Sequence, residues 1–194
     1  EKDGFVCLFD GKTLKGWEGK PEFWSVRDGV ITAQTTKENP TKGNTFLIWR
    51  GGEPADFELN LQFRIVGGNS GIQYRSVEVA DFVVGGYQAD FEAGDRFIGI
   101  LYEEKGRGIL AMRGNKVVIH EDGKKETVGS TCDEKAMLAS INKEGWNEYT
   151  IIAKGNHLIQ KINGHTTVEV TDNQTAKSRA KGIIALQLHA GPPM

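Results

Sequence analysis

The last part of the chain alternates between hydrophobic and polar residues. From Ile184 to His189, isoleucine and leucine occupy every second position, and a small residue, an amide and an imidazole occupy the positions between them. A period of two predicts a β-strand with one buried face. Gly191-Pro192-Pro193 follows and ends the strand. The polar side of this strand therefore presents Gln187 and His189 beside a stiff turn.

Two earlier segments repeat this arrangement. Polar residues again stand two positions apart, and if the three strands share one sheet they form one polar surface made of Gln73, Arg75, Gln88, Asp90, Gln187 and His189. The simpler interpretation is the solvated face of an antiparallel sheet. Such faces usually carry Lys, Glu and Thr, whereas amides, Arg, Asp and His suit a hydroxyl-rich ligand. We therefore favour a binding site.

The rest of the chain predicts short strands joined by tight turns. The expected strands are 4–9, 23–26, 30–33, 45–49, 56–66, 97–102, 109–112, 116–120, 125–128, 146–153, 157–162 and 166–170. Residues 76–86 are expected to form a loop or a short strand, and 134–141 is the one expected helix. This pattern predicts an all-β fold, a two-sheet antiparallel β-sandwich of jelly-roll type with one short helix.

Composition narrows the class of protein. The 194 residues fit a single domain over 1–194, and the net charge of −2 comes with scattered basic residues, which argues against nucleic-acid binding. No apolar run is long enough to span a membrane. Cys7 and Cys132 could form a disulfide or be two buried thiols, and we favour the thiols. The composition predicts no oligomeric state.

Four residues are candidates for catalysis. His189 can change its charge near neutral pH. Asp90 and Glu103 are the candidate carboxylate pair for proton transfer, and Glu104 could substitute for Glu103. Arg107, which stands between two glycines, could reach an oxyanion.

Other kinds of site receive less support. No G-x-S-x-G segment is present, so a serine hydrolase is not expected. No HExxH motif or H-x-H pair indicates a preformed zinc site. A divalent metal ion held by Asp90, Glu103 and His189 is compatible with the residue types but requires that the three converge.

Several motifs together resemble a known family. The motifs are Leu8-Phe9-Asp10-Gly11-Lys12-Thr13-Leu14, Trp24-x-Val26-x-Asp28-Gly29, Gly68-Asn69-Ser70-Gly71-Ile72-Gln73-Tyr74-Arg75, Gly86-Tyr87-Gln88-Ala89-Asp90, Trp146-Asn147-x-Tyr149 and Gln187-Leu188-His189-x-Gly191-Pro192-Pro193. They resemble the 3-keto-disaccharide hydrolase domain family over nearly the whole chain. The resemblance implies a concanavalin A-like, laminarinase-like sandwich and export to the periplasm, the cell surface or the medium of a bacterium.

The resemblance also implies the chemistry. The family cleaves glycosides that carry a ketone at C3, by removal of the C2 proton, elimination of the C1 substituent and addition of water. Under this hypothesis His189 or Asp90 is the base, Glu103 is the proton donor, and Arg107 or a divalent ion holds the oxyanion. The sugar hydroxyls would be bound by Gln73, Arg75, Gln88, Tyr102 and Gln187.

One departure and two alternatives remain. The family usually has a further strand after the Gly-Pro-Pro segment, whereas this chain stops at Met194, so either that strand has been cut off or this protein has lost it. A non-catalytic carbohydrate-binding module is the first alternative, with Trp24, Trp49 or Tyr102 stacking on a sugar ring. An ordinary glycosidase with two carboxylates is the second.

Overall fold

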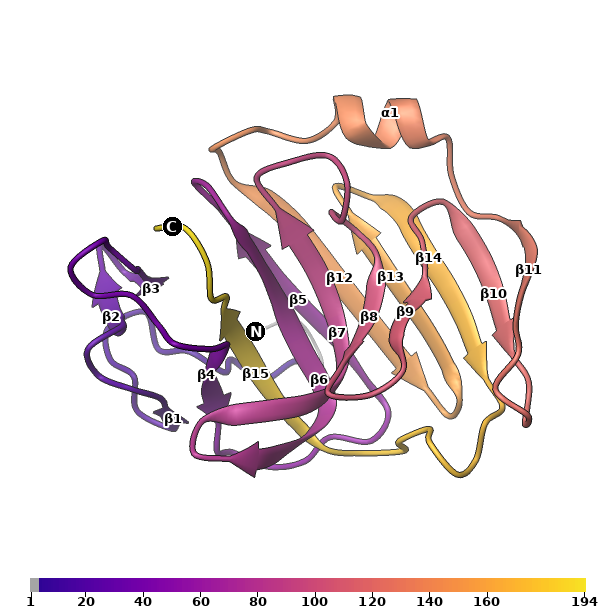
Figure 1. The fold of residues 1–194 in the computed structure, drawn as a ribbon, viewed down its shortest axis with the longest axis horizontal. Coiled ribbons are helices and arrows are strands. Elements are labelled where there is room, and N and C mark those ends of the chain that lie inside the picture. The colour runs from indigo at the N-terminus through magenta and orange to yellow at the C-terminus, as the bar shows by residue number, and fades with distance from the viewer. Residues whose placement is uncertain (1–3) are drawn as a thin grey trace.

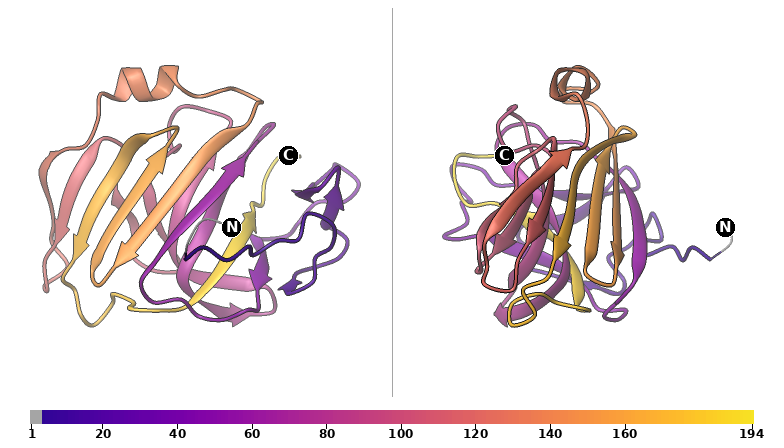
Figure 2. Two further views of the ribbon diagram at one scale, coloured as in Figure 1. Left: turned by 180° about the vertical axis from the view of Figure 1, so that it is seen from behind. Right: turned by 90° about the vertical axis from the view of Figure 1, so that its right-hand side faces the viewer.

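Two β-sheets pack face to face in the computed structural model, which describes residues 4–194 (Figures 1 and 2). The seven-stranded sheet has the order β1 (Trp17–Glu18), β4 (Thr45–Trp49), β15 (Ile183–Leu188), β6 (Asn69–Ala80), β7 (Val83–Glu92), β8 (Leu101–Glu104) and β9 (Gly108–Ala111). The six-stranded sheet has the order β11 (Lys125–Ser130), β10 (Asn115–Ile119), β14 (His165–Asp172), β13 (His157–Ile162), β12 (Asn147–Lys154) and β5 (Phe57–Phe63). The predicted two-sheet sandwich is confirmed.

Two smaller elements complete the fold. β2 (Trp24–Arg27) and β3 (Val30–Ala33) form a hairpin beside the seven-stranded sheet, and the helix α1 (Glu134–Ala139) lies at one end of the sandwich (Figure 1). Asp133 caps the helix by accepting hydrogen bonds from the backbone amides of Lys135 and Ala136. Both elements had been expected from the turn and helix patterns.

The interior between the sheets comes from the hydrophobic side of the alternation. Ile72, Tyr74 and Ala89 point from the seven-stranded sheet toward Tyr149 and Ile151 of the six-stranded sheet. One amide is also buried there: Gln160 donates to the Tyr74 hydroxyl and accepts from the Tyr149 hydroxyl, both at 3.1 Å. Because the core takes this side of β6 and β7, their polar side lies on the outer face of the seven-stranded sheet.

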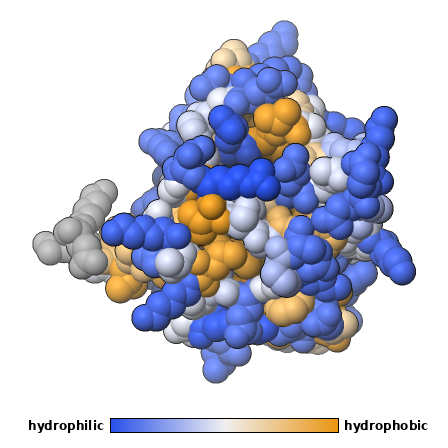
Figure 3. All heavy atoms as spheres, turned by 90° about the vertical axis from the view of Figure 1, so that its left-hand side faces the viewer, coloured by the Kyte–Doolittle hydropathy of each residue, from blue (hydrophilic) through white to orange (hydrophobic). Residues whose placement is uncertain are grey.

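A second cluster fills the space beneath the hairpin. Trp17, Phe23 and Trp24 pack there with Leu47 and Leu188. On this side of the molecule, hydrophobic side chains show between hydrophilic ones (Figure 3). The hairpin thus covers the part of β4 and β15 that the six-stranded sheet does not reach.

Some strand predictions were wrong. Residues 4–9 form no strand; the carbonyl of Leu8 instead accepts a hydrogen bond from the Trp17 indole at 2.7 Å. The segment 76–86 is mostly strand, because β6 and β7 pair almost to their tip, where Phe82 turns with φ 49°. In addition, β10 and β14 pair in parallel within a sandwich that is otherwise antiparallel.

Two further findings concern the cysteines and the helix α1. Cys7 and Cys132 are free thiols, as favoured, but neither is fully buried: Cys7 is exposed and Cys132 is half-buried. Within residues 4–194, no helix is long and apolar enough to cross a membrane.

Candidate active site

Strand register brings the predicted amides together. Gln73 of β6 lies opposite Gln88 of β7, and Gln88 lies opposite Tyr102 of β8. On the other side of β6, Ala185 pairs with Gln73, which places Gln187 on the same face two residues further along β15. The outer face of the seven-stranded sheet therefore carries one group of polar side chains, as the sequence predicts.

Hydrogen bonds connect these side chains into a directed chain. The Ser76 hydroxyl donates to Gln73 Oε1 at 2.6 Å, and Gln73 Nε2 donates to Gln88 Oε1 at 2.6 Å. Gln88 Nε2 in turn donates to Asp90 Oδ1 at 2.6 Å. Gln187 Nε2 joins the chain by donating to Gln88 Oε1 at 3.0 Å. The amide orientations are thus fixed by their neighbours.

The amides are buried although they lie outside the core. The exposed fraction is 0% for Gln73 and 2% for both Gln88 and Gln187. Close packing is possible because residue 71 is glycine: a Cβ there would stand 2.5 Å from the Gln88 side chain. Burial of a polar group costs free energy unless the group is hydrogen-bonded, and these amides meet that requirement by bonding to one another and to Asp90.

Asp90 is the most perturbed acid of this face. It is 6% exposed, and burial raises its pKa to about 8, with the charges of Glu104 and Glu92 adding to the increase. Hydrogen bonds from Gln88 and Asn69 oppose the shift without cancelling it. At neutral pH the Asp90 carboxyl group therefore holds its proton, and it can act as an acid.

Glu104 completes the face at its other side. It lies opposite Gly86 and two residues from Tyr102, and it is 9% exposed. Its Oε2 accepts from Gln187 Nε2 and from Asn44 Nδ2, each at 3.4 Å. Two carboxyl groups thus share this surface, at opposite ends of the amide chain.

Sequence reasoning missed Asn44, which links two parts of the site. Besides donating to Glu104, Asn44 accepts from the backbone amide of Ala190 at 2.9 Å. Its position, two residues before Phe46 on the outer side of β4, was the available signal. Asn44 therefore holds the segment that carries His189 beside the Glu104 carboxylate.

His189 stands directly after β15, two residues beyond Gln187 in the sequence, and is partly buried. Its Nδ1 lies within hydrogen-bond distance of its neighbour's carbonyl, that of Ala190. A carbonyl oxygen only accepts, so the contact fits the tautomer that carries its hydrogen on Nδ1. In the neutral ring Nε2 is then the unprotonated nitrogen, which is able to accept a proton.

Glu103 and Arg107 do not lie on this face, contrary to the expectation that Glu103 would stand beside Asp90. Because side chains alternate along β8, Glu103 points away from Glu104. Its carboxylate binds Arg107 through Nε at 2.8 Å and through Nη2 at 2.9 Å, and Arg107 also binds Asp172 at 2.7 Å. Arg107 is thus committed to two buried carboxylates.

Arg75 also leaves the predicted surface. A β-bulge between Tyr74 and Val77, with Arg75 at φ 46°, breaks the alternation of β6. The guanidinium is buried elsewhere, where it binds Asp56 at 3.0 Å and the backbone carbonyl of Ala55 at 2.7 Å. Arg75 therefore supports the sandwich rather than the polar face.

The proposed set of metal ligands does not assemble. Asp90 and Glu103 lie on opposite faces, so they cannot bind one ion together with His189. Among residues 4–194, no group of three or more His, Cys, Asp or Glu side chains has the geometry to hold a metal ion.

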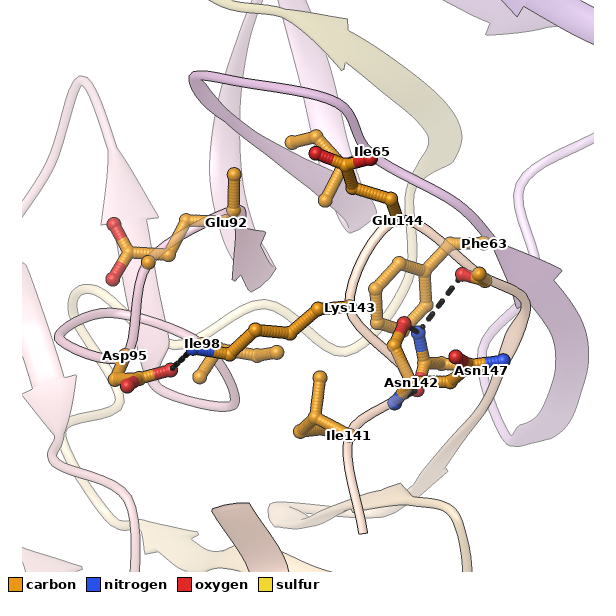
Figure 4. Close-up of a pocket in the computed structure, with 13 residues that line it drawn as sticks. Phe63, Ile65, Glu92, Asp95, Ile98, Ile141, Asn142, Lys143, Glu144 and Asn147 are labelled. Atoms are coloured by element: carbon orange, nitrogen blue, oxygen red, sulfur yellow. Dashed lines mark hydrogen bonds and ion pairs between the residues drawn. The ribbon is translucent and has the colours of Figure 1, made fainter. Parts of the chain in front are cut away.

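A separate small pocket lies at the end of the sandwich near α1 (Figure 4). Phe63, Ile65, Ile98 and Ile141 form its apolar part, and the ion pair between Lys143 and Asp95, at 3.4 Å, lies beside it. None of the amides of the polar face lines it. The pocket and the polar face are therefore distinct sites.

Comparison with known protein families and sequences gives two matches. A model of the 3-keto-alpha-glucoside-1,2-lyase-like domain matches residues 4–194. A 3-keto-disaccharide hydrolase from Bacteroides thetaiotaomicron is 35% identical, over 41% of this chain and 30% of that protein. The matched part thus spans less than a third of that relative's length.

Two solved structures share the fold. The carbohydrate binding module CBM66 from Bacillus subtilis has a TM-score of 0.59 at 13% identity, covering 90% of this chain and 88% of that one. A protein named "Putative glycosyl hydrolase" from Parabacteroides distasonis has a TM-score of 0.60 at 21% identity, covering 94% of this chain and 90% of that one.

Proposed function

The chain belongs to the 3-keto-alpha-glucoside-1,2-lyase-like family, and from this premise we propose that it cleaves glycosides that carry a ketone at C3. The polar face is the proposed active site. The observation that carries this proposal is Asp90, a buried carboxyl group with a pKa raised to about 8 at the end of an ordered amide chain. A surface that only binds sugar has no need of an acid in this protonation state.

The first step requires a base. The C3 ketone acidifies the hydrogen on C2, and His189 Nε2 accepts that proton, because Nδ1 is already engaged with the Ala190 carbonyl. The electron pair of the C2–H bond moves into an enolate that includes the C3 oxygen. His189 was one of the two bases considered from the sequence, and it takes this role because the other, Asp90, already holds a proton.

The second step requires an acid. The enolate collapses, a double bond forms between C1 and C2, and the bond from C1 to the leaving oxygen breaks. Asp90 donates its proton to that oxygen. Water then adds to the double bond. Its oxygen bonds to C1 while one of its protons returns to Asp90, and His189 gives the abstracted proton back to C2, which gives net hydrolysis and restores both side chains.

The remaining polar residues hold the sugar and tune the acid. Tyr102, which is only partly buried, binds a sugar hydroxyl, and the buried Gln73, Gln88 and Gln187 hold the two carboxyl groups of the face in place. Glu104 takes the place of Glu103 as the second carboxyl group of the site, because its side chain lies on the polar face. Its negative charge contributes to the raised pKa of Asp90 and keeps that acid protonated.

Turnover of a 3-keto-glucoside beside its unoxidised parent tests the proposal, with Asp90→Asn as the matched variant and a chelator as a separate arm. Cleavage of the keto form alone, lost in Asp90→Asn, is the expected result. Saturable binding of both sugars without cleavage would instead establish a carbohydrate-binding module. Cleavage of the unoxidised parent would indicate an ordinary glycosidase.

A further inference from the structure

A second pocket adjoins the proposed active site at the far side of Glu104. Its volume is about 170 Å³, which exceeds the space that a single water molecule requires. Glu104 and Gly86, which pair across β7 and β8 on the polar face, both line it. A group attached to a sugar bound over the amides can therefore extend into this pocket.

Three cations surround this pocket: Lys105 from the β8–β9 turn, and Lys177 and Arg179 from the segment before β15. All three are exposed, and within residues 4–194 none of their side chains takes part in an ion pair. Two segments that are distant in sequence thus direct unpaired positive charge at one hollow.

The lining also contains two carboxylates, of which Glu103 is neutralised by an ion pair whereas Glu104 has none among residues 4–194, so three cations stand against one unpaired carboxylate. Glu103 is bound by Arg107, and Glu104 accepts from the amides of Asn44 and Gln187. Three glycines in the lining, Gly85, Gly86 and Gly106, contribute backbone without side chains. Peptide backbone and free cations together form a surface that suits an anion.

We propose that this pocket binds an anionic part of the substrate, a carboxylate, sulfate or phosphate carried by the glycoside next to the ring that is cleaved. This inference rests on the proposed function, and it defines the substrate class as an acidic glycoside. Lys177 and Arg179 determine specificity without touching the reacting atoms.

Three probes test the inference: phenyl 3-keto-glucoside, 4-carboxyphenyl 3-keto-glucoside and phenyl 3-keto-glucuronide, each as both anomers. At least one acidic probe is expected to have a lower KM than the neutral one. We call the ratio of the KM of the neutral probe to that of the acidic probe the acidic advantage. In the double variant Lys177→Gln/Arg179→Gln, this advantage falls about 2- to 20-fold, the range expected for two exposed ion pairs. The neutral probe keeps its KM and kcat.

The control variant is Lys154→Gln, which removes an exposed cation on β12 of the other sheet that has no ion-pair partner in the described part of the chain. It should leave the advantage intact. Equal KM for all three probes, or equal losses for acidic and neutral probes in the double variant, would overturn the inference.

Calorimetric binding of the unoxidised phenyl glucoside, 4-carboxyphenyl glucoside and phenyl glucuronide separates this inference from the proposed function. If no keto probe is cleaved, the proposed function fails. Tighter binding of an acidic sugar that is lost in the double variant would still support the anion pocket, and equal binding would refute it.

Discussion

Glu103 and Glu104 are consecutive residues of one strand, yet their carboxylates lie on opposite faces of the seven-stranded sheet. Glu103 binds Arg107 at 2.8 Å, whereas Glu104 accepts from Asn44 and Gln187, each at 3.4 Å. Adjacent residues of the same type thus have separate duties. One holds the β8–β9 turn together, and the other contributes charge to the proposed active site.

Exchanging each of these acids for glutamine should affect a different property: the pH dependence of activity for Glu104 and the stability of the fold for Glu103. In Glu104→Gln, loss of the neighbouring charge lowers the pKa of Asp90, so the alkaline limb of the kcat/KM profile moves to lower pH while thermal stability changes little. In Glu103→Gln, the buried pair with Arg107 is broken, which costs about 3 kcal/mol of unfolding free energy. Enzyme assays across pH and thermal unfolding of both variants check this. An unchanged pH profile in Glu104→Gln would contradict it.

Asp90 should make stability depend on pH. Its pKa is about 8 in the folded protein and about 4 in the unfolded chain, so the folded state holds the extra proton between these values. The contribution of Asp90 to stability is therefore fully present below about pH 4 and is lost as pH rises toward 8. As pH rises from about 4 to 8, the free energy of unfolding of Asp90→Asn should therefore increase relative to that of the wild type, by roughly a few kcal/mol. Urea unfolding at several pH values measures the difference, and a constant offset would show that the pKa is not raised.

His189 should be required for proton removal. His189→Ala is expected to lower kcat about 100-fold or more for a 3-keto-glucoside, the usual contribution of a general base. Exchange of the C2 hydrogen with deuterated solvent should be lost in parallel. His165→Ala is a suitable control, because that residue lies at the start of β14 in the other sheet. Full turnover in His189→Ala would assign the base elsewhere, with Glu104 the next candidate.

The buried amide between the sheets should contribute to stability alone. Gln160→Leu leaves the hydroxyls of Tyr74 and Tyr149 without this partner, which costs about 2 kcal/mol or more. For a chain of this size, that loss lowers Tm by about 4–8 °C. Gln62→Leu, at an exposed position of β5, should stay within about 0.5 kcal/mol of the wild type. Equal effects of the two changes on Tm would show that the Gln160 bonds are not important.

The hydrophobic alternation predicted the sandwich and part of the site. It placed Gln73, Gln88, Asp90 and Gln187 on one face, because a period of two is a local property of each strand. The predicted strand 97–102 ends at Tyr102, whereas β8 continues to Glu104. Extending the alternation by two residues places Glu104 on the same face as Tyr102.

Long-range and irregular features could not be predicted in this way. The partner that withdraws Arg107 from the site, Asp172, is 65 residues away in sequence. The displacement of Arg75 results from a bulge, which inserts an extra residue into the pairing and leaves no mark on the polar pattern. Asn44 directly precedes β4, so the alternation of that strand places it on the outer side, but its contacts with Glu104 and Ala190 are long-range and leave no mark in the sequence.

The directed amide chain also settles which oxygen of Asp90 is chemically available. Gln88 Oε1 accepts from Gln73 and Gln187, so its Nε2 must face Asp90 Oδ1. A carboxylic acid accepts best on its carbonyl oxygen, which assigns the hydrogen to Oδ2. In the proposed mechanism, the sheet therefore sets the direction from which a proton leaves Asp90, through three glutamines that need not touch the bond being broken.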